Sequence, residues 1–72
     1  MSDVVFNHSK LLGRIRERGY TQLELAKAVG MNPGTMSLKL NNGSRFVTDE
    51  IDAICEKLDI APCDIGVYFF AK

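Results

Sequence analysis

The sequence predicts an all-α fold, a compact bundle of about five short helices. Apolar residues recur with the spacing of a buried helix face, most clearly at Ile51, Ile54 and Leu58. Residues with capping chemistry precede such stripes and glycines follow them, as at Gly19 and Gly30. With 72 residues, the chain is the size of one small domain, and we expect residues 1–72 to form a single folding unit.

The first helix is predicted from about Asn7 or His8 to Arg18. Asn7 is a possible N-cap, and Gly19 ends the helix. We expect the core-facing residues to be Leu11, Leu12 and Ile15, and the largely solvated ones to be Arg14, Arg16 and Arg18.

The middle of the chain, residues 21–40, predicts a helix-turn-helix. Thr21 and Glu24 have the spacing of a capping box, and Gly30 can adopt the left-handed backbone that ends a helix. Asn32 then caps the second helix, with Pro33 at its first position. The residues of this unit that we expect to face inward are Leu25, Ala26, Val29, Met36 and Leu40. Such a unit leaves the outer side of its second helix free to meet a partner.

Two more helices complete the bundle. The polar run 41–45 is a turn by composition, after which we expect Phe46 and Val47 to return to the core. Thr48 is the predicted cap of the fourth helix. Pro62 and Asp64 can open a short fifth helix around Ile65.

The last residues form an aromatic segment that is predicted to be either helical or extended. Three aromatic side chains in a row cannot all be buried in so small a domain. We therefore favour a homodimer or partner interface made by Val67, Tyr68, Phe69 and Phe70. The alternative is that Phe69 closes the core and Phe70 lies on the surface.

The charges are divided between the two halves of the chain, although the net charge is zero. Through Arg45 there are seven Lys or Arg against three acids, and from Phe46 onward two against six. This distribution can offer a basic face to nucleic-acid phosphates. The alternative is that the charges only keep opposite faces soluble.

The residues give no indication of catalysis, and we predict no catalytic residue, metal or cofactor. His8 is the only histidine, no acid or nucleophile stands at a spacing that would recruit it, and we expect it on the surface. Cys55 and Cys63 lack metal-binding spacing and are expected to be buried reduced thiols. Without a signal peptide or a long apolar run, the chain is expected in the cytoplasm and not in a membrane.

The segment TQLELAKAVG followed by TMSLKLNNG resembles the DNA-binding domains of lambdoid phage repressors and Cro proteins. In addition, KLNNGSRF followed by TDEI is similar to a branch of small phage regulators. The resemblance implies a lambda repressor-like fold and a phage regulator that binds double-stranded operator DNA as a dimer.

Helix geometry and this resemblance together point to the residues that would meet DNA. The base-side candidates on the outer side of the second helix are Asn32, Gly34, Thr35, Ser37 and Leu38. The resemblance places Gln22 at a position that meets a phosphate, and we expect further backbone contacts from Lys39, Asn42 and Arg45.

The second helix departs from the family's usual pattern, which has long polar side chains at its start and centre. Pro33 and Gly34 cannot make contacts that discriminate bases, and Leu38 could press a thymine methyl or insert into a protein partner. Two functions therefore stay open. We favour a sequence-specific operator-binding regulator, and the alternative is an antirepressor that binds a phage repressor protein.

Overall fold

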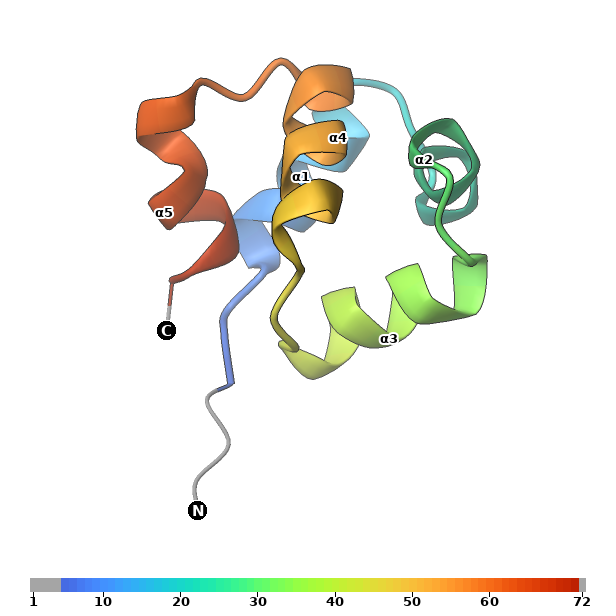
Figure 1. The fold of residues 1–72 in the computed structure, drawn as a ribbon, viewed down its shortest axis with the longest axis horizontal. Coiled ribbons are helices and arrows are strands. Elements are labelled where there is room, and N and C mark those ends of the chain that lie inside the picture. The colour runs from blue at the N-terminus through green and yellow to red at the C-terminus, as the bar shows by residue number, and fades with distance from the viewer. Residues whose placement is uncertain (1–4, 72) are drawn as a thin grey trace.

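The computed structural model describes residues 5–71, and within them the chain is all-helical, as predicted (Figure 1). The elements are α1 (Ser9–Glu17), α2 (Gln22–Val29), α3 (Pro33–Asn42), α4 (Thr48–Leu58), the 3₁₀ turn η1 (Pro62–Asp64) and α5 (Ile65–Phe69). The C-terminal aromatic segment is thus mostly helical. None of these helices has the length and apolar character needed to cross a membrane.

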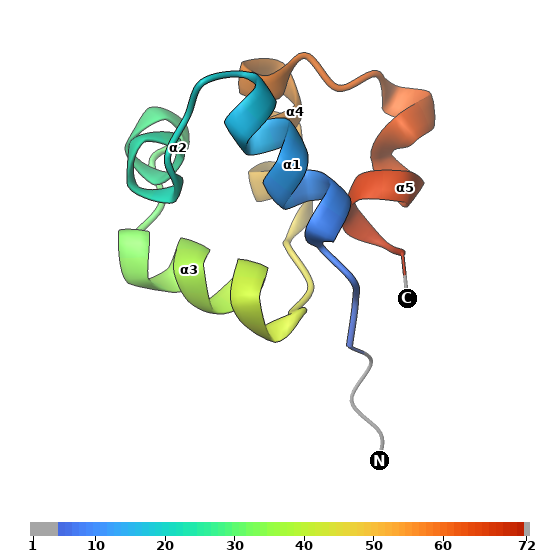
Figure 2. The same ribbon diagram turned by 180° about the vertical axis from the view of Figure 1, so that it is seen from behind.

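The arrangement places α3 at the edge of the bundle. α2 packs against both α3 and α4, and α5 packs against α1 and α4. From the opposite side, α1 crosses in front of α4, with α2 and α5 on either side (Figure 2). The outer side of α3 therefore faces away from the rest of the molecule.

The core is a single cluster to which every α-helix contributes. Its largest fully buried side chains are Phe46, Phe69, Leu11, Ile15, Leu25, Met36, Ile54 and Leu58. The predicted inward stripes of α1, α3 and α4 are confirmed by this cluster, because residues three and four apart on a helix share one face. Val47 is a correction, since its side chain is exposed and only Phe46 returns to the core.

The start of α4 also differs from the prediction. Thr48 is the first residue of the helix, not its cap, and Val47 occupies the cap position. The Glu50 carboxylate accepts a hydrogen bond from the Val47 backbone N–H at 2.9 Å. Glu50 thus satisfies an amide that lies just outside the helix.

His8 and Arg14 are not the solvated side chains that the sequence predicted. His8 is buried, and its Nε2 lies 2.8 Å from the Ser44 carbonyl oxygen, between the rings of Phe6 and Phe46. The Arg14 guanidinium donates hydrogen bonds to the carbonyl oxygens at the end of α4. Both side chains were expected on the surface, but His8 contacts one backbone carbonyl group and Arg14 satisfies two.

The thiols require a smaller correction. Both cysteines are free, as expected, but Cys55 is only half-buried and Cys63 is exposed. Burial raises the pKa of the Cys55 thiol, as does the nearby charge of Asp52.

The N-terminal segment closes the bundle between the α3–α4 turn and the end of α5. The Phe6 N–H donates to the Gly43 carbonyl at 2.8 Å, and the Asn7 N–H donates to the Ala71 carbonyl at 2.7 Å. Residues from both ends of the described chain are therefore held together.

Candidate functional site

The helix-turn-helix forms as the capping residues predicted. Thr21 and Glu24 make a reciprocal capping box. Gly30 ends α2 in the left-handed conformation, with a φ of 76°. The Asn32 side-chain oxygen accepts hydrogen bonds from the backbone N–H groups of Gly34 and Thr35, at 2.8 and 3.3 Å. Because this oxygen caps α3, it is already engaged within the chain.

The outer side of α3 presents short polar side chains and one large apolar side chain. Gly34, Thr35 and Leu38 are exposed, and 62% of Leu38 is accessible to solvent. Ser37 is half-buried and its hydroxyl accepts a hydrogen bond from the Asn41 amide at 3.1 Å. The exposed part of this helix is therefore mainly apolar at its centre.

Lys39, a predicted phosphate contact, is engaged with α4. Its ammonium lies 2.5 Å from the Glu50 carboxylate, and the two side chains are only 20% and 18% exposed. The ammonium also lies 5.6 Å from the centre of the Phe46 ring. Burial alone would raise the pKa of Glu50, but the hydrogen bonds from Lys39 and Val47 and the charge of Lys39 lower it overall. The positive charge of Lys39 is thus neutralised inside the molecule.

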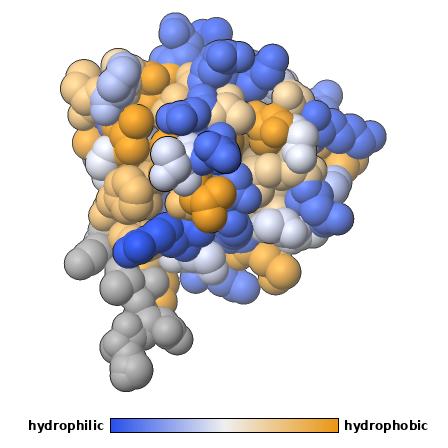
Figure 3. Space-filling model, in the orientation of Figure 1, coloured by the Kyte–Doolittle hydropathy of each residue, from blue (hydrophilic) through white to orange (hydrophobic). Residues whose placement is uncertain are grey.

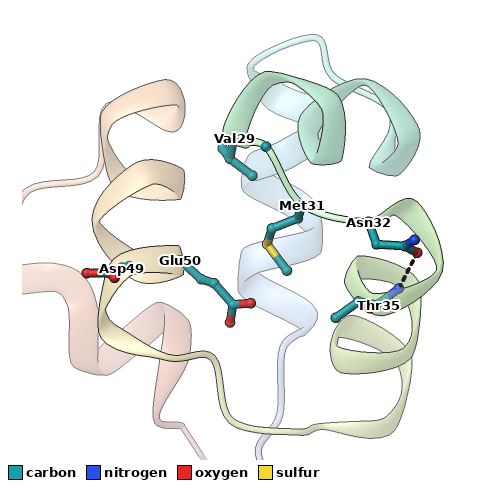
Figure 4. Close-up of a pocket in the computed structure, with 7 residues that line it drawn as sticks. Val29, Met31, Asn32, Thr35, Asp49 and Glu50 are labelled. Atoms are coloured by element: carbon teal, nitrogen blue, oxygen red, sulfur yellow. Dashed lines mark hydrogen bonds between the residues drawn. The ribbon is translucent and has the colours of Figure 1, made fainter.

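A groove of about 390 Å³ lies between α3 and the start of α4. Its lining residues are Val29, Gly30, Met31, Asn32, Thr35, Asp49 and Glu50. Figure 4 shows the Glu50 carboxylate and the Met31 thioether reaching into the space between α4 and α3, whereas Asp49 points away from it. The Glu50 carboxylate in this hollow is already paired with Lys39, whereas Asp49 is exposed at the rim, where a carboxylate repels phosphates and attracts cationic side chains. We call this hollow the α3–α4 groove.

The remaining predicted backbone contacts do not join the groove. Gln22 is half-buried at the start of α2, and Asn42 is exposed at the end of α3. Arg45 is exposed in the following turn, with its guanidinium 5.8 Å from the centre of the Phe6 ring. These residues therefore lie at three separate places: the start of α2, the end of α3 and the turn after α3.

The four residues of the predicted C-terminal interface differ in their exposure to solvent. Phe69 is 1% exposed and belongs to the core, where its ring meets Phe46 edge-on at 5.7 Å. Tyr68 is half-buried, whereas Val67 and Phe70 are exposed. On the face drawn in Figure 3, hydrophobic residues gather on the side of α5. Phe69 presents no surface, so the dimer or partner interface stays a prediction for Val67, Tyr68 and Phe70.

Two features were missed by reasoning from the sequence. Leu23 is an exposed apolar residue of α2, and the signal was available: at 3.6 residues per turn it lies roughly 160° around the helix from buried Leu25. The second feature is the position of Asp49 and Glu50 in the lining of the α3–α4 groove, which was not predicted. Their position beside α3 follows from the packing of α2 on α4, which no local pattern encodes.

The chain is similar in sequence and structure to a solved phage protein. This is the modulator of repression (MOR) of the temperate bacteriophage TP901-1 from Lactococcus lactis, determined in solution. The two chains are 39% identical, the match covers 96% of this chain and 93% of that chain, and the TM-score is 0.75. Among curated proteins, no sequence matches.

These findings correct two predictions made from the resemblance to repressors and Cro proteins. The helix-turn-helix fold is confirmed, but the assignment to the Cro and repressor family is not. The preferred function, a sequence-specific regulator that binds operator DNA, is wrong, because the similar solved protein is a modulator of repression. The family model that matches, over residues 4–72, shows that the chain belongs to the family described as "Protein of unknown function (DUF739)".

Proposed function

We propose that the chain is a phage regulator that modulates repression by binding a phage repressor protein. One observation carries this proposal: the 39% identity to a modulator of repression over nearly the whole length of both chains. On this view the helix-turn-helix is used as a protein-binding scaffold, in the cytoplasm, and the chain is a binding protein and not an enzyme.

The surface of α3 supports a protein partner over DNA. The lysine of this helix is neutralised by Glu50, and the exposed carboxylate of Asp49 lies at the rim of the groove beside its first turn. Phosphate contacts supply much of the affinity of DNA-binding proteins, so this surface lacks their main source of attraction. Leu38, exposed at the centre of the helix, instead offers the apolar contact that protein interfaces use.

The α3–α4 groove fits a cationic side chain of such a partner. Val29 and Met31 give it an apolar wall, against which the aliphatic part of a lysine or arginine can pack. Asp49 at its rim carries a charge that is not engaged in an ion pair within residues 5–71. A repressor must carry lysine and arginine to bind DNA, so its surface can supply the complementary charge.

The proposal is tested with the repressor encoded in the same phage or prophage genome. Calorimetric titration of the purified chain into this repressor is expected to show saturable binding. In a mobility-shift assay, adding the chain is expected to change the amount of repressor bound to its operator. The chain alone is the control and is expected to leave operator and scrambled DNA equally unshifted. Absence of binding to the repressor would overturn the proposal.

A further inference from the structure

A second concave surface lies at the start of α2, whereas the α3–α4 groove lies at the end of this helix. It is a slot of about 260 Å³ between α1 and the first turn of α2. Its lining residues are Leu12, Ile15, Arg16, Tyr20, Thr21 and Gln22. In Figure 2, α1 and the turn that leads into α2 are seen on the near side of the molecule. We call this surface the α1–α2 slot.

The floor of the slot is apolar. Ile15 is buried, and Leu12 and Tyr20 are partly buried and pack against the core. The space is sufficient for one large apolar side chain, and filling it would remove apolar surface from water. Because its floor belongs to the core, the slot is formed before any partner arrives.

The rim of the slot is polar and cationic. Arg16 is exposed, and the ion pairs of residues 5–71 are those of Arg14 with Glu17 and of Lys39 with Glu50. The carboxylates nearest to Arg16 in sequence are engaged elsewhere: Glu17 pairs with Arg14, and Glu24 accepts the Thr21 backbone N–H. The positive charge at the rim is therefore not neutralised by the described chain.

We propose that the α1–α2 slot receives a large apolar side chain of the repressor that stands beside an aspartate or glutamate. The apolar side chain would contact Leu12, Ile15 and Tyr20, and the carboxylate would pair with Arg16. Gln22, at the start of α2, would then donate a hydrogen bond to the repressor, and not to a phosphate as the sequence predicted. This inference rests on the proposed function, and it adds a second contact whose charge is opposite to that of the α3–α4 groove.

Charge reversal at the rim provides the first test. Arg16→Glu is expected to weaken calorimetric binding of the repressor about tenfold or more, because a close pair of opposite charges becomes a repulsive one. Arg18→Glu is the matched control, since Arg18 is exposed at the end of α1 and does not line the slot. Its effect is expected to stay within about twofold. Circular dichroism checks that both variants are folded.

Methyl resonances provide the second test and do not depend on a variant. On titration with the repressor, the methyl signals of Leu12 and Ile15 are expected to shift together with the Arg16 side-chain N–H signal. Shifts confined to α3 or α5, with equal affinities for Arg16→Glu and Arg18→Glu, would overturn the slot while leaving the proposed function standing. Shifts of Leu12 and Ile15 produced by raising the concentration of the chain alone would overturn it as well, since a second copy would then fill the slot. A repressor that does not bind at all would overturn both proposals.

Discussion

Arg14 of α1 binds the end of α4: its Nε–H donates a hydrogen bond to the carbonyl oxygen of Leu58 at 3.0 Å. The same guanidinium reaches the Asp59 carbonyl at 3.1 Å and pairs with Glu17 within its own helix. Asp59 is the one non-glycine residue of the described chain with a positive φ, 56°. The carbonyl groups at a helix end lack partners within the helix, so a guanidinium from α1 satisfies them from outside.

Replacing Arg14 tests this contact. Arg14→Ala is expected to lower the thermal midpoint by several degrees, because the last carbonyl groups of α4 lose their donors. Arg14→Lys is expected to recover little, since one ammonium lacks the planar set of donors that spans two carbonyl groups and a carboxylate. Arg16→Ala is the control and is expected to leave the midpoint nearly unchanged. Equal midpoints for Arg14→Ala and Arg16→Ala in a calorimetric scan would show that the contact does not stabilise the fold.

Gly43 is expected to be far less replaceable than Gly19, although both have a positive φ. A Cβ at Gly43 would lie 2.4 Å from the Phe6 carbonyl oxygen, whereas a Cβ at Gly19 meets nothing within 4 Å. Gly19→Ala should therefore cost about 1 kcal/mol from the backbone conformation. Gly43→Ala should cost a further 1–3 kcal/mol or so, because the N-terminal segment must move. Urea unfolding of the two variants measures the difference, and equal midpoints would contradict it.

The half-buried pair of Glu50 with Lys39 is expected to make stability depend on pH. The folded state lowers the pKa of Glu50 below its usual 4.5, so its contribution is fully present above that pH and is lost as the pH falls through the lower folded value. Glu50→Gln should therefore cost about 1 kcal/mol at pH 7 and progressively less below about pH 4.5. Asp49→Asn, at the exposed neighbouring position, is the control. A cost of Glu50→Gln that stays constant from pH 7 to pH 3 would contradict the expectation.

Leu38 is expected to contribute to partner binding without contributing to folding. Because its side chain is mostly exposed, Leu38→Ala should leave the thermal midpoint nearly unchanged and should weaken calorimetric binding of the repressor about fivefold or more. Val67→Ala, which trims an exposed apolar residue of α5, is the matched comparison. If Val67→Ala weakens binding and Leu38→Ala does not, the repressor contacts α5 and not α3.

The parts of the fold that follow from local rules could be predicted from the sequence. The capping box of Thr21 and Glu24, the left-handed Gly30 and the Asn32 cap each depend on neighbouring residues only, and all three form. The placement of Val47 and Thr48 was wrong by one position, because the choice of cap at α4 is decided by the reach of the Glu50 side chain.

Contacts between residues far apart in the sequence could not be predicted in this way. His8 and Arg14 were expected in solvent, yet they bind carbonyl groups 36 and 44 residues away. The function was misjudged for a related reason. A helix-turn-helix pattern specifies the position of α3 but not the charge of its surface. That charge depends on Glu50, a residue of another helix, which neutralises Lys39.

The hydrogen bond from the Asn7 N–H to the Ala71 carbonyl has a consequence for synthesis on the ribosome. Chains emerge from their N-terminal end, so the segment that carries Phe6 and His8 leaves the ribosome well before its acceptor at Ala71. Closure of this segment must therefore wait until residue 71 has left the ribosome. Until residue 70 has emerged, the ring of Phe6 in the nascent chain lacks its aromatic neighbour Phe70.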